Sequence, residues 1–263
     1  MDVQTPRSLE EALRLKAERP DAVPIQGGTD MMVDLNFDRR RPSLLLNLNE
    51  VAELRGWSRE NGTIRLGAAL TYTEAMESRL AGALPALAEA SRTVGGPQIR
   101  NRATVGGNLG TASPAGDALP PLLIADGVVE LASVRGARTM ALTEFLTGPK
   151  TNALADDELI TGVRVRADAG SQTFMKVGPR NAMVIAVVSL ALVVDHEQDE
   201  VRAAFGSAGP VPGLVTEPLA ELEGLPERVA AAASPIDDVR GSAAYRRHAL
   251  KVLATRAVDR CLQ

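Results

Sequence analysis

The chain has 263 residues, of which 45% are hydrophobic and 24% are charged, and its formal net charge is -4. This composition is ordinary for a globular protein that is long enough to bury the core of one large domain or two smaller ones. The acidic balance argues against a nucleic-acid-binding protein, because such proteins need a basic face to neutralise phosphates. With one cysteine, Cys261, and two widely separated histidines, we expect no disulfide, iron–sulfur cluster or other protein-held metal in this chain.

The sequence gives no indication of export or of membrane insertion. It begins Met-Asp-Val-Gln, without the basic start and apolar segment of a signal peptide. The longest apolar run, residues 183–194, is interrupted by Ser189 and is too short to cross a bilayer. We therefore expect a cytoplasmic protein.

Short helices and strands are predicted in mixed order over the first part of the chain. Ser8 and Glu11 form a capping-box pattern, which predicts a helix from there to the residue before Pro20. A strand over residues 22–25 then leads into a glycine pair and a helical turn at 31–35. Two further strands and two helices are predicted at residues 44–48, 64–68, 73–80 and 85–91.

The later part of the chain predicts two groups of strands, separated by a domain boundary at residues 166–170. Before the boundary, a short helix is expected around Glu144, and strands are expected at residues 127–134, 138–142 and 157–165. After it, an antiparallel sheet and three helical segments are expected, with strands at 173–177, 184–194 and 201–207 and helices at 212–223, 225–233 and from about Ser242. Because strands and helices do not alternate strictly, the fold class is predicted to be α+β.

Residues 104–117 are almost all small, hydroxyl-bearing or turn-forming. We expect this stretch to stay out of the core and to present backbone amides to a ligand, since glycines allow close approach and successive amides bind anions. Asp117 is expected to cap a short helix that carries Pro120. The stretch thus predicts a diphosphate cradle, with a plain surface loop as the alternative.

A second glycine pair, in residues 26–30, follows a strand and precedes a helical turn, which is typical of an anion site. Together the two loops could hold the two phosphates of a dinucleotide from opposite sides; the alternative is two unrelated turns. Neither loop has the G-x-G-x-x-G spacing and the P-loop pattern is missing, so a Rossmann site is disfavoured.

Single residues give weaker indications. Lys176 ends a predicted strand and is either solvated or a positive charge near a phosphate or a flavin ring. Arg100 and Arg102 flank the second loop and could contact a phosphate or a partner surface. Ser113 lacks the setting of a nucleophile and is rejected as one.

These motifs resemble the flavoprotein subunit of the molybdenum hydroxylase family, which includes xanthine dehydrogenase and the medium subunit of carbon monoxide dehydrogenase. Residues 26–30 (QGGTD) resemble its first flavin loop, and residues 100–108 (RNRATVGGN) with 112–117 (ASPAGD) resemble its second. Residues 174–181 resemble the start of its C-terminal domain, and residues 238–247 resemble its closing helix. The resemblance covers essentially the whole chain.

The resemblance implies a vanillyl-alcohol-oxidase (PCMH)-type FAD-binding domain at residues 1–166, with two α+β lobes at about 1–56 and 57–166. A C-terminal domain like that of the CO dehydrogenase flavoprotein, an antiparallel sheet with helices, is expected at residues 171–263. FAD would lie extended between the lobes, and no catalytic side chain is expected. The implied cofactor contacts lie in both loops and at isolated positions elsewhere, namely Pro24, Ile25, Gln26, Gly27, Gly28, Thr29, Asp30, Met31, Val94, Gly95, Thr104, Gly106, Gly107, Asn108, Thr111, Ser113, Asp117, Ile160 and Lys176.

The resemblance also implies an electron-transferring subunit, xanthine-dehydrogenase-like in kind. The molybdenum cofactor would lie on a large partner subunit and two [2Fe-2S] clusters on a small one, in a dimer of heterotrimers. FAD would take electrons from a cluster and pass them to NAD or another acceptor. Two alternatives stay open: a self-standing flavin oxidase or reductase of the same fold, and a non-catalytic subunit that binds a nucleotide structurally.

Overall fold

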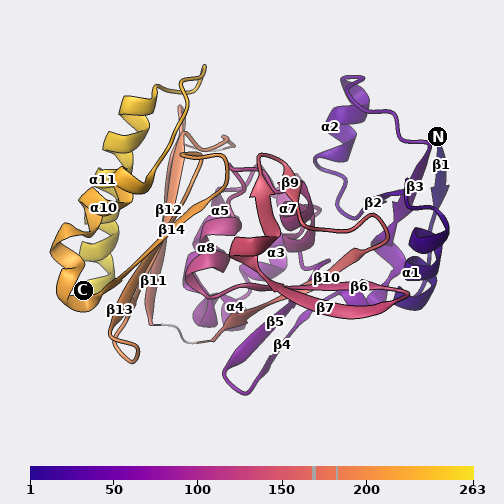
Figure 1. Cartoon of the computed structure of the whole chain (residues 1–263), viewed down its shortest axis with the longest axis horizontal. Coiled ribbons are helices and arrows are strands. Elements are labelled where there is room, and N and C mark those ends of the chain that lie inside the picture. The colour runs from indigo at the N-terminus through magenta and orange to yellow at the C-terminus, as the bar shows by residue number, and fades with distance from the viewer. Residues whose placement is uncertain (168–169, 182) are drawn as a thin grey trace.

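The computed structural model describes residues 1–167, 170–181 and 183–263 (Figure 1). Within these residues the strands form a three-stranded, a five-stranded, a four-stranded and a two-stranded sheet. The four-stranded sheet belongs to residues 170–263, here called the C-terminal part, and the others belong to residues 1–167, the N-terminal part. The predicted boundary at 166–170 includes Asp168 and Ala169, which lie outside the described residues. The predicted α+β class is confirmed.

The first sheet is parallel, with the strand order β1-β3-β2. It is built from β1 (Asp2–Gln4), α1 (Leu9–Glu18), β2 (Val23–Ile25), α2 (Met31–Asn36) and β3 (Leu44–Asn47), followed by the 3-10 helices η1 (Leu48–Glu50) and η2 (Ala52–Leu54). Ala12 of α1 is buried with Leu44 and Leu46 in a small core that also includes Leu159 of the second sheet. Helix α2 projects from this sheet, at the upper right of Figure 1.

Helix α1 begins where the sequence predicts. The hydroxyl of Ser8 accepts a hydrogen bond from Glu11 N–H at 3.1 Å. The Glu11 carboxylate accepts from Arg7 N–H at 2.8 Å. The predicted cap at Ser8 is therefore confirmed. The Glu11 carboxylate, however, accepts from Arg7 N–H and not from Ser8 N–H as in a capping box.

The second sheet is antiparallel and five-stranded, in the order β4-β5-β10-β6-β7. Its strands are β4 (Trp57–Glu60), β5 (Thr63–Gly67), β6 (Val128–Ser133), β7 (Gly136–Ala141) and β10 (Leu159–Arg166). The helices between β5 and β6 are α3 (Tyr72–Ala75), α4 (Ser78–Ala83), α5 (Pro85–Thr93), α6 (Pro97–Arg100), α7 (Val105–Thr111) and α8 (Leu119–Ile124). Between β7 and β10 lie α9 (Leu142–Phe145) and the hairpin of β8 (Leu146–Gly148) and β9 (Thr151–Asn152).

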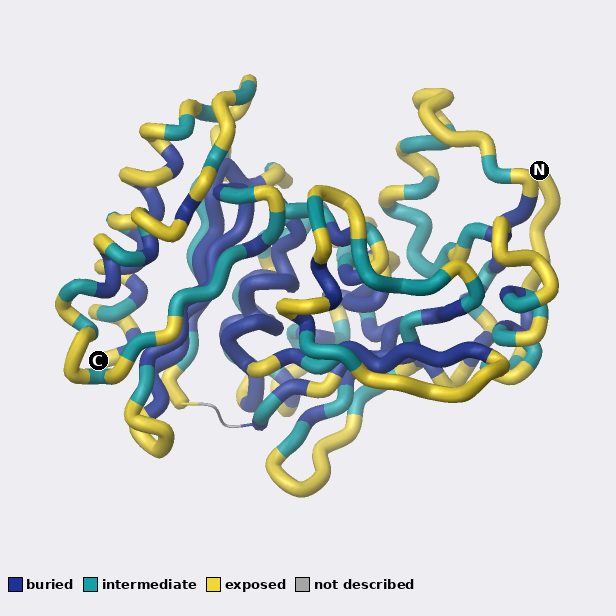
Figure 2. Tube along the Cα trace, viewed as in Figure 1, coloured by how far each residue is buried: buried dark blue, intermediate teal, exposed yellow. Residues whose placement is uncertain are grey.

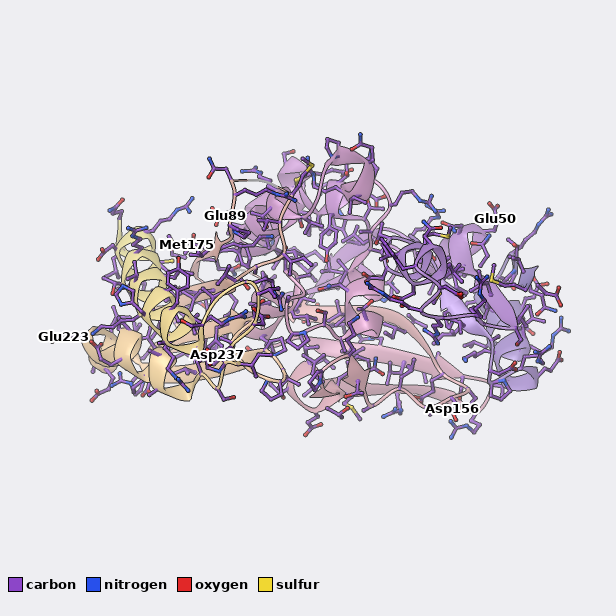
Figure 3. The ribbon with its side chains drawn as sticks, turned by 90° about the horizontal axis from the view of Figure 1, so that it is seen from above. Glu50, Glu89, Asp156, Met175, Glu223 and Asp237 are labelled. Carbon is purple, nitrogen blue, oxygen red and sulfur yellow. The ribbon has the colours of Figure 1, made fainter. Side chains whose placement is uncertain are left out.

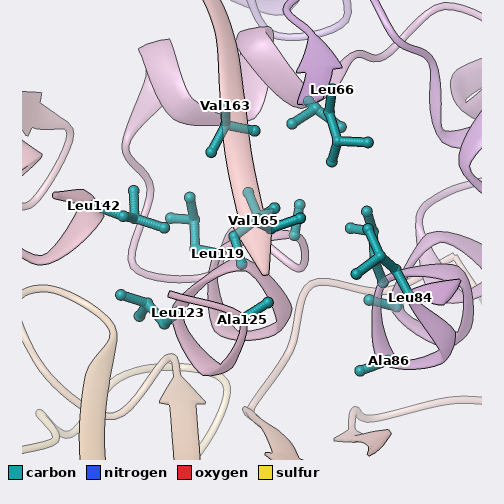
Figure 4. Close-up of a cluster of buried hydrophobic side chains, with 14 of the residues drawn as sticks. Leu66, Leu84, Ala86, Leu119, Leu123, Ala125, Leu142, Val163 and Val165 are labelled. Atoms are coloured by element: carbon teal, nitrogen blue, oxygen red, sulfur yellow. The ribbon is translucent and has the colours of Figure 1, made fainter. Parts of the chain in front are cut away.

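The main core lies between this sheet and its helices, as the close-up in Figure 4 shows. Leu66 and Val163 of the sheet lie in one buried cluster with Leu84, between α4 and α5, and with Leu119 and Leu123 of α8. All five side chains are at least 97% buried. Burial of this apolar surface holds the helices, and hence the segments that connect them, in fixed places on the sheet.

The C-terminal part is an antiparallel sheet in chain order, backed by two helices. Its elements are β11 (Ser171–Val177), β12 (Val188–Asp195), β13 (Glu200–Gly206), β14 (Gly213–Pro218), η3 (Leu219–Gly224), α10 (Leu225–Ala232) and α11 (Ala243–Leu262). Helices α10 and α11 cover one face, and the other face lies on α5 and α8 of the N-terminal part (Figure 1). None of the described helices is long and apolar enough to span a membrane.

Strand β12 is buried along its whole length, as Figure 2 shows, because the sheet is covered on both sides. Ala191 and Val193 belong to the core of the N-terminal part, whereas Leu190 and Leu192 belong to the cluster under α10 and α11. The alternation follows the two-residue period of a strand. One strand thereby joins both hydrophobic cores.

Three predicted elements differ from the structure. The predicted helix at 212–223 is wrong: residues 213–218 form β14, which pairs with β13 and satisfies its otherwise open edge. The predicted helix at 73–80 is two helices, α3 and α4, which meet at Met76 and Glu77. The stretch 104–117 includes a helix, α7, and its Val105 and Leu109 are fully buried, so the expectation that it stays out of the core is wrong.

Candidate functional site

The two glycine-pair loops meet in space. A Cβ added to Gly27 would collide with the backbone carbonyl of Arg102, so glycine is required there. The guanidinium of Arg102 also donates to the carbonyl oxygen of Gln26 at 3.2 Å and to Asn49 Oδ1 at 3.1 Å. The first loop is thus held directly against the segment that leads into α7.

A side-chain hydrogen bond makes a second link between the loops. The hydroxyl of Thr111, the last residue of α7, donates to Asp30 Oδ2 at 2.8 Å. Asp30 stands at the N-cap position of α2, yet within the described chain its side chain forms no hydrogen bond to that helix. Its carboxylate therefore joins the two loops and does not cap α2.

The first loop has backbone donors to offer. Among the described residues, the N–H groups of residues 27–30 donate to no protein acceptor. Gly28 has a φ of 77°, in the left-handed region that favours glycine, and its carbonyl accepts from Met32 N–H at the start of α2. Gln26 Oε1 is buried beside these amides, without a partner in the described part of the chain. Successive amides of this kind bind anions.

The second loop offers fewer amides than the sequence predicts, because α7 is attached to the end of β5. Val105 N–H donates to the Leu70 carbonyl and Gly106 N–H to the Ala68 carbonyl, both at 2.9 Å. Gly107 N–H donates to Thr104 Oγ1 at 3.0 Å. Asn108 N–H donates to the Thr104 carbonyl at 3.0 Å. What this loop can present to a ligand is the exposed surface of Gly107 and the side-chain amide of Asn108.

Asn108 links the second loop to the turn that follows it. Its Oδ1 is buried and has no partner within residues 1–167, 170–181 and 183–263. A Cβ on Gly116 would lie 2.7 Å from Asn108 Nδ2, so the two residues are in close contact. Ser113 Oγ accepts from Ala115 N–H at 3.3 Å in the same turn. The side chain of Ile160, from β10, lies 3.7 Å from a Cβ placed on Gly110.

Asp117 and Lys176 form a buried ion pair, with Lys176 Nζ donating to Asp117 Oδ2 at 2.6 Å. Their side chains are only 10% and 6% exposed. Burial raises the pKa of Asp117 above its ordinary value, although Lys176 opposes this. The predicted cap at Asp117 is therefore wrong, because α8 has Ala118 at its N-cap position. The solvated alternative for Lys176 is wrong as well.

Val94 and Gly95 follow α5 directly and are held by one arginine. Arg100 Nη1 donates to the carbonyl oxygens of Val94 at 3.1 Å and Gly95 at 2.9 Å. Gly95 has a φ of 45°, and a Cβ there would lie 2.8 Å from Ile99. Lys176 Nζ donates to the neighbouring Thr93 carbonyl at 3.2 Å, which brings this segment beside Asp117.

Contacts thus link many of the predicted residues into one chain of neighbours. It runs from residues 24–31 across Thr111 and Asn108 to Asp117, Lys176 and residues 94–95. Sequence reasoning did not include Arg100, Arg102 or the Thr93 carbonyl among the cofactor-site residues. The two arginines stood out only as neighbours of the second loop, and nothing in the sequence pointed to Thr93.

Comparison with known proteins identifies the family. The family described as "FAD binding domain in molybdopterin dehydrogenase" matches residues 1–166, and "CO dehydrogenase flavoprotein C-terminal domain" matches residues 173–261. The chain is 31% identical to the xanthine dehydrogenase FAD-binding subunit of Escherichia coli O157:H7 over 271 residues, covering 96% of this chain and 92% of the relative. It is 33% identical to the nicotine 6-hydroxylase medium subunit of Paenarthrobacter nicotinovorans, covering 97% of this chain and 94% of the relative.

A solved structure agrees with this. A chain of the Cu,Mo-CO dehydrogenase superposes with a TM-score of 0.92 at 25% identity, covering 99% of this chain and 97% of the other. The alignment therefore covers the N-terminal and the C-terminal parts together over almost the full length. The chain belongs to the FAD-binding flavoprotein subunits of the molybdenum hydroxylase family, the oxidoreductases that include xanthine dehydrogenase and carbon monoxide dehydrogenase.

Proposed function

We propose that this chain binds FAD along the surface between residues 24–31 and residues 104–113 and transfers electrons within a molybdenum hydroxylase complex. The observation that carries the proposal is the set of groups without protein partners in the described chain. These are the four consecutive amides of residues 27–30 and the buried oxygens of Gln26 and Asn108. Buried polar groups need partners, and the phosphates and polar groups of a dinucleotide would supply them.

When bound, FAD supplies one- and two-electron redox chemistry, while the protein binds and orients it. The amides of residues 27–30 would bind the pyrophosphate, and the bare surface of Gly107 would let it come close. Lys176, held by Asp117, would place a positive charge beside the flavin ring, next to the backbone of residues 94–95. The remaining contacts that the family resemblance implies, from Pro24 to Ile160, are part of the same proposal.

We further propose the partners that the resemblance implies. A large subunit would carry the molybdenum cofactor, a small subunit would carry the [2Fe-2S] clusters, and two such heterotrimers would associate. The relatives described as FAD-binding and medium subunits support a role beside other chains. NAD is the proposed electron acceptor, and a xanthine-dehydrogenase-like enzyme is the proposed kind.

The same proposal assigns residues 1–166 to FAD binding, in lobes of about 1–56 and 57–166, and residues 171–263 to a C-terminal domain. The separate sheets of these regions support this division. A cytoplasmic location stays a prediction.

Spectroscopy of the purified chain tests the proposal. We expect FAD to bind with one-to-one stoichiometry and an absorbance maximum at about 450 nm, which is a property of flavins. NADH oxidation with an artificial acceptor, without turnover of organic substrates, is expected in the absence of partner subunits. A chain that binds no FAD would contradict the proposal and favour a non-catalytic subunit. Turnover of an organic substrate by the chain alone would favour a self-standing flavin enzyme.

A further inference from the structure

Glu89, on α5, accepts three hydrogen bonds from the C-terminal part. Its Oε2 accepts from the hydroxyl of Thr173 at 2.9 Å and from the backbone N–H of Phe174 at 2.7 Å, and its Oε1 accepts from Arg260 Nη2 at 2.8 Å. Figure 3 labels Glu89 close to Met175, where α5 meets β11. No sequence motif pointed to this carboxylate, and the proposed cofactor contacts do not include it.

Two of these bonds fix the edge of a sheet. Strand β11 is one of the two edge strands of the order β11-β12-β13-β14, so the backbone groups on its outer side lack a strand neighbour. The Glu89 carboxylate accepts from one of them, Phe174 N–H, and from Thr173, which is 1% exposed. Because an unpaired buried N–H is costly, this bond sets how β11 lies along α5.

The same strand and helix meet a second time at the proposed flavin site. Thr93 is the last residue of α5, one helical turn beyond Glu89, and its carbonyl accepts from Lys176 Nζ at 3.2 Å. Lys176 lies only two residues beyond Phe174 and also reaches Asp117. A shift of β11 along α5 would therefore move the Lys176 ammonium away from both of its acceptors.

We propose that Glu89 is a positioning residue of the flavin site: it holds β11 on α5 so that Lys176 reaches Asp117 and the Thr93 carbonyl. This inference rests on the proposed FAD function and deepens it. Glu89 acts through Lys176, and the two hydrogen bonds to β11 carry the effect. The ion pair with Arg260 contributes little, because the arginine side chain is 54% exposed.

A double-mutant cycle on the full-length chain tests this, with the FAD dissociation constant and the flavin absorption spectrum as readouts. Glu89→Ala is expected to weaken FAD binding about tenfold and to change the spectrum as Lys176→Ala does. Because Glu89 acts through Lys176, the double variant should bind no more weakly than Lys176→Ala alone. Arg260→Ala and Glu89→Gln, which keeps an acceptor oxygen for Phe174 N–H, should stay within about threefold of wild type.

Asp126→Asn is the matched control. Asp126 pairs with Arg202 across the same boundary between the two parts, and its φ of 53° suits asparagine. It should lower thermal stability but leave the FAD dissociation constant within about twofold of wild type. Equal weakening by Asp126→Asn and Glu89→Ala would overturn the inference, as would full additivity of Glu89→Ala with Lys176→Ala.

The remaining outcomes are also decisive. If Glu89→Ala does not fold, the FAD dissociation constant of Glu89→Gln is the test. A Glu89→Gln variant that binds FAD as weakly as Lys176→Ala would overturn the role given to the β11 hydrogen bonds. Wild-type binding decides the proposed function separately. If the wild-type chain binds no FAD, both proposals are wrong. If the wild-type chain and Glu89→Ala bind FAD equally well, only the role proposed for Glu89 is wrong.

Discussion

At the scale of single residues, the two adjacent glycines of α7 are required for different reasons. A Cβ on Gly106 would lie 2.5 Å from the carbonyl oxygen of Ala68, which also accepts the Gly106 N–H. Gly107 is exposed, and a Cβ there would meet Thr104 Oγ1 at 3.1 Å, with no other described atom within 4 Å outside the neighbouring residues and the helix's own backbone. The fold requires the first glycine, and the proposed cofactor requires the second.

Substitutions should separate these two roles. Gly106→Ala is expected to destabilise the protein by about 1–3 kcal/mol, because the added methyl group meets backbone that cannot move freely. Gly107→Val should unfold within a few degrees of wild type but should not retain FAD, because its side chain occupies the surface that the pyrophosphate would approach. Thermal unfolding and the flavin content of the purified variants measure the two effects. Stoichiometric FAD on Gly107→Val would show that the second loop is wrongly assigned.

At the scale of elements, helix α11 is attached to the sheet by one buried arginine. Arg246 is 2% exposed and donates to the carbonyl oxygens of Val187 and Ser207 and, at 2.6 Å, to Asp238 Oδ1. Burial alone would raise the pKa of Asp238, but hydrogen bonds from Arg240 and Arg246 lower it to about 2. Arg246 therefore joins α11 to residues next to β12 and β13, and the ionised Asp238 joins the segment before α11 to that arginine.

The lowered pKa predicts a pH dependence of stability. A carboxyl whose folded-state pKa is below its unfolded value stabilises the fold at higher pH, and that contribution is lost as the pH falls from about 4 to about 2. Asp238→Asn should be less stable than wild type at pH 7 and should lose less stability over this acidic range. Urea unfolding at several pH values measures both quantities. Parallel stability curves for the two proteins would contradict the role given to Asp238.

Cys261, near the end of α11, reports on whether this helix stays in place. Burial raises the pKa of its thiol to about 11, so little thiolate is present near neutral pH. We expect a thiol reagent at pH 8 to label the folded chain about 100-fold more slowly than the urea-unfolded chain. Asp238→Asn should label faster than wild type, because α11 opens more readily. Equal rates in folded and unfolded chains would mean that α11 is not packed as described.

The elements predicted correctly from the sequence are those with a clear local pattern, such as α1 with its Ser8 cap and the alternating strand β5. Helix α7 was not predicted, because its glycines have low helix propensity. It forms because Val105 and Leu109 are buried and because its first backbone amides donate hydrogen bonds to carbonyl groups just after β5. Strand β14 was not predicted for a similar reason: it forms because its backbone pairs with the distant edge of β13. For the site, the loop positions were predictable, whereas the burial and pairing of Asp117 depend on a strand far away in the sequence.

At the scale of the whole molecule, charged pairs and a shared core join the two parts. The ion pairs that cross the boundary within the described residues include Arg166–Asp195, Lys176–Asp117, Arg202–Asp126 and Arg260–Glu89. The main core also includes Phe174, Ala191 and Val193 of the C-terminal sheet together with leucines of α5 and α8. The five-stranded and the four-stranded sheets are not hydrogen-bonded to each other, but they share one hydrophobic core. The proposed flavin site depends on both parts of the chain.

This shared interior predicts that the chain unfolds as one cooperative unit. Separating the parts would expose the apolar faces of α5, α8 and β12 and break ion pairs such as that of Asp126 with Arg202, which is 3% exposed. Calorimetry should show one transition whose calorimetric and van't Hoff enthalpies agree. FAD at about one hundred times its dissociation constant should shift that whole transition upward, by about 2.7 kcal/mol of added stability. Two transitions, with only the first moved by FAD, would mean that the C-terminal part folds independently of the flavin site.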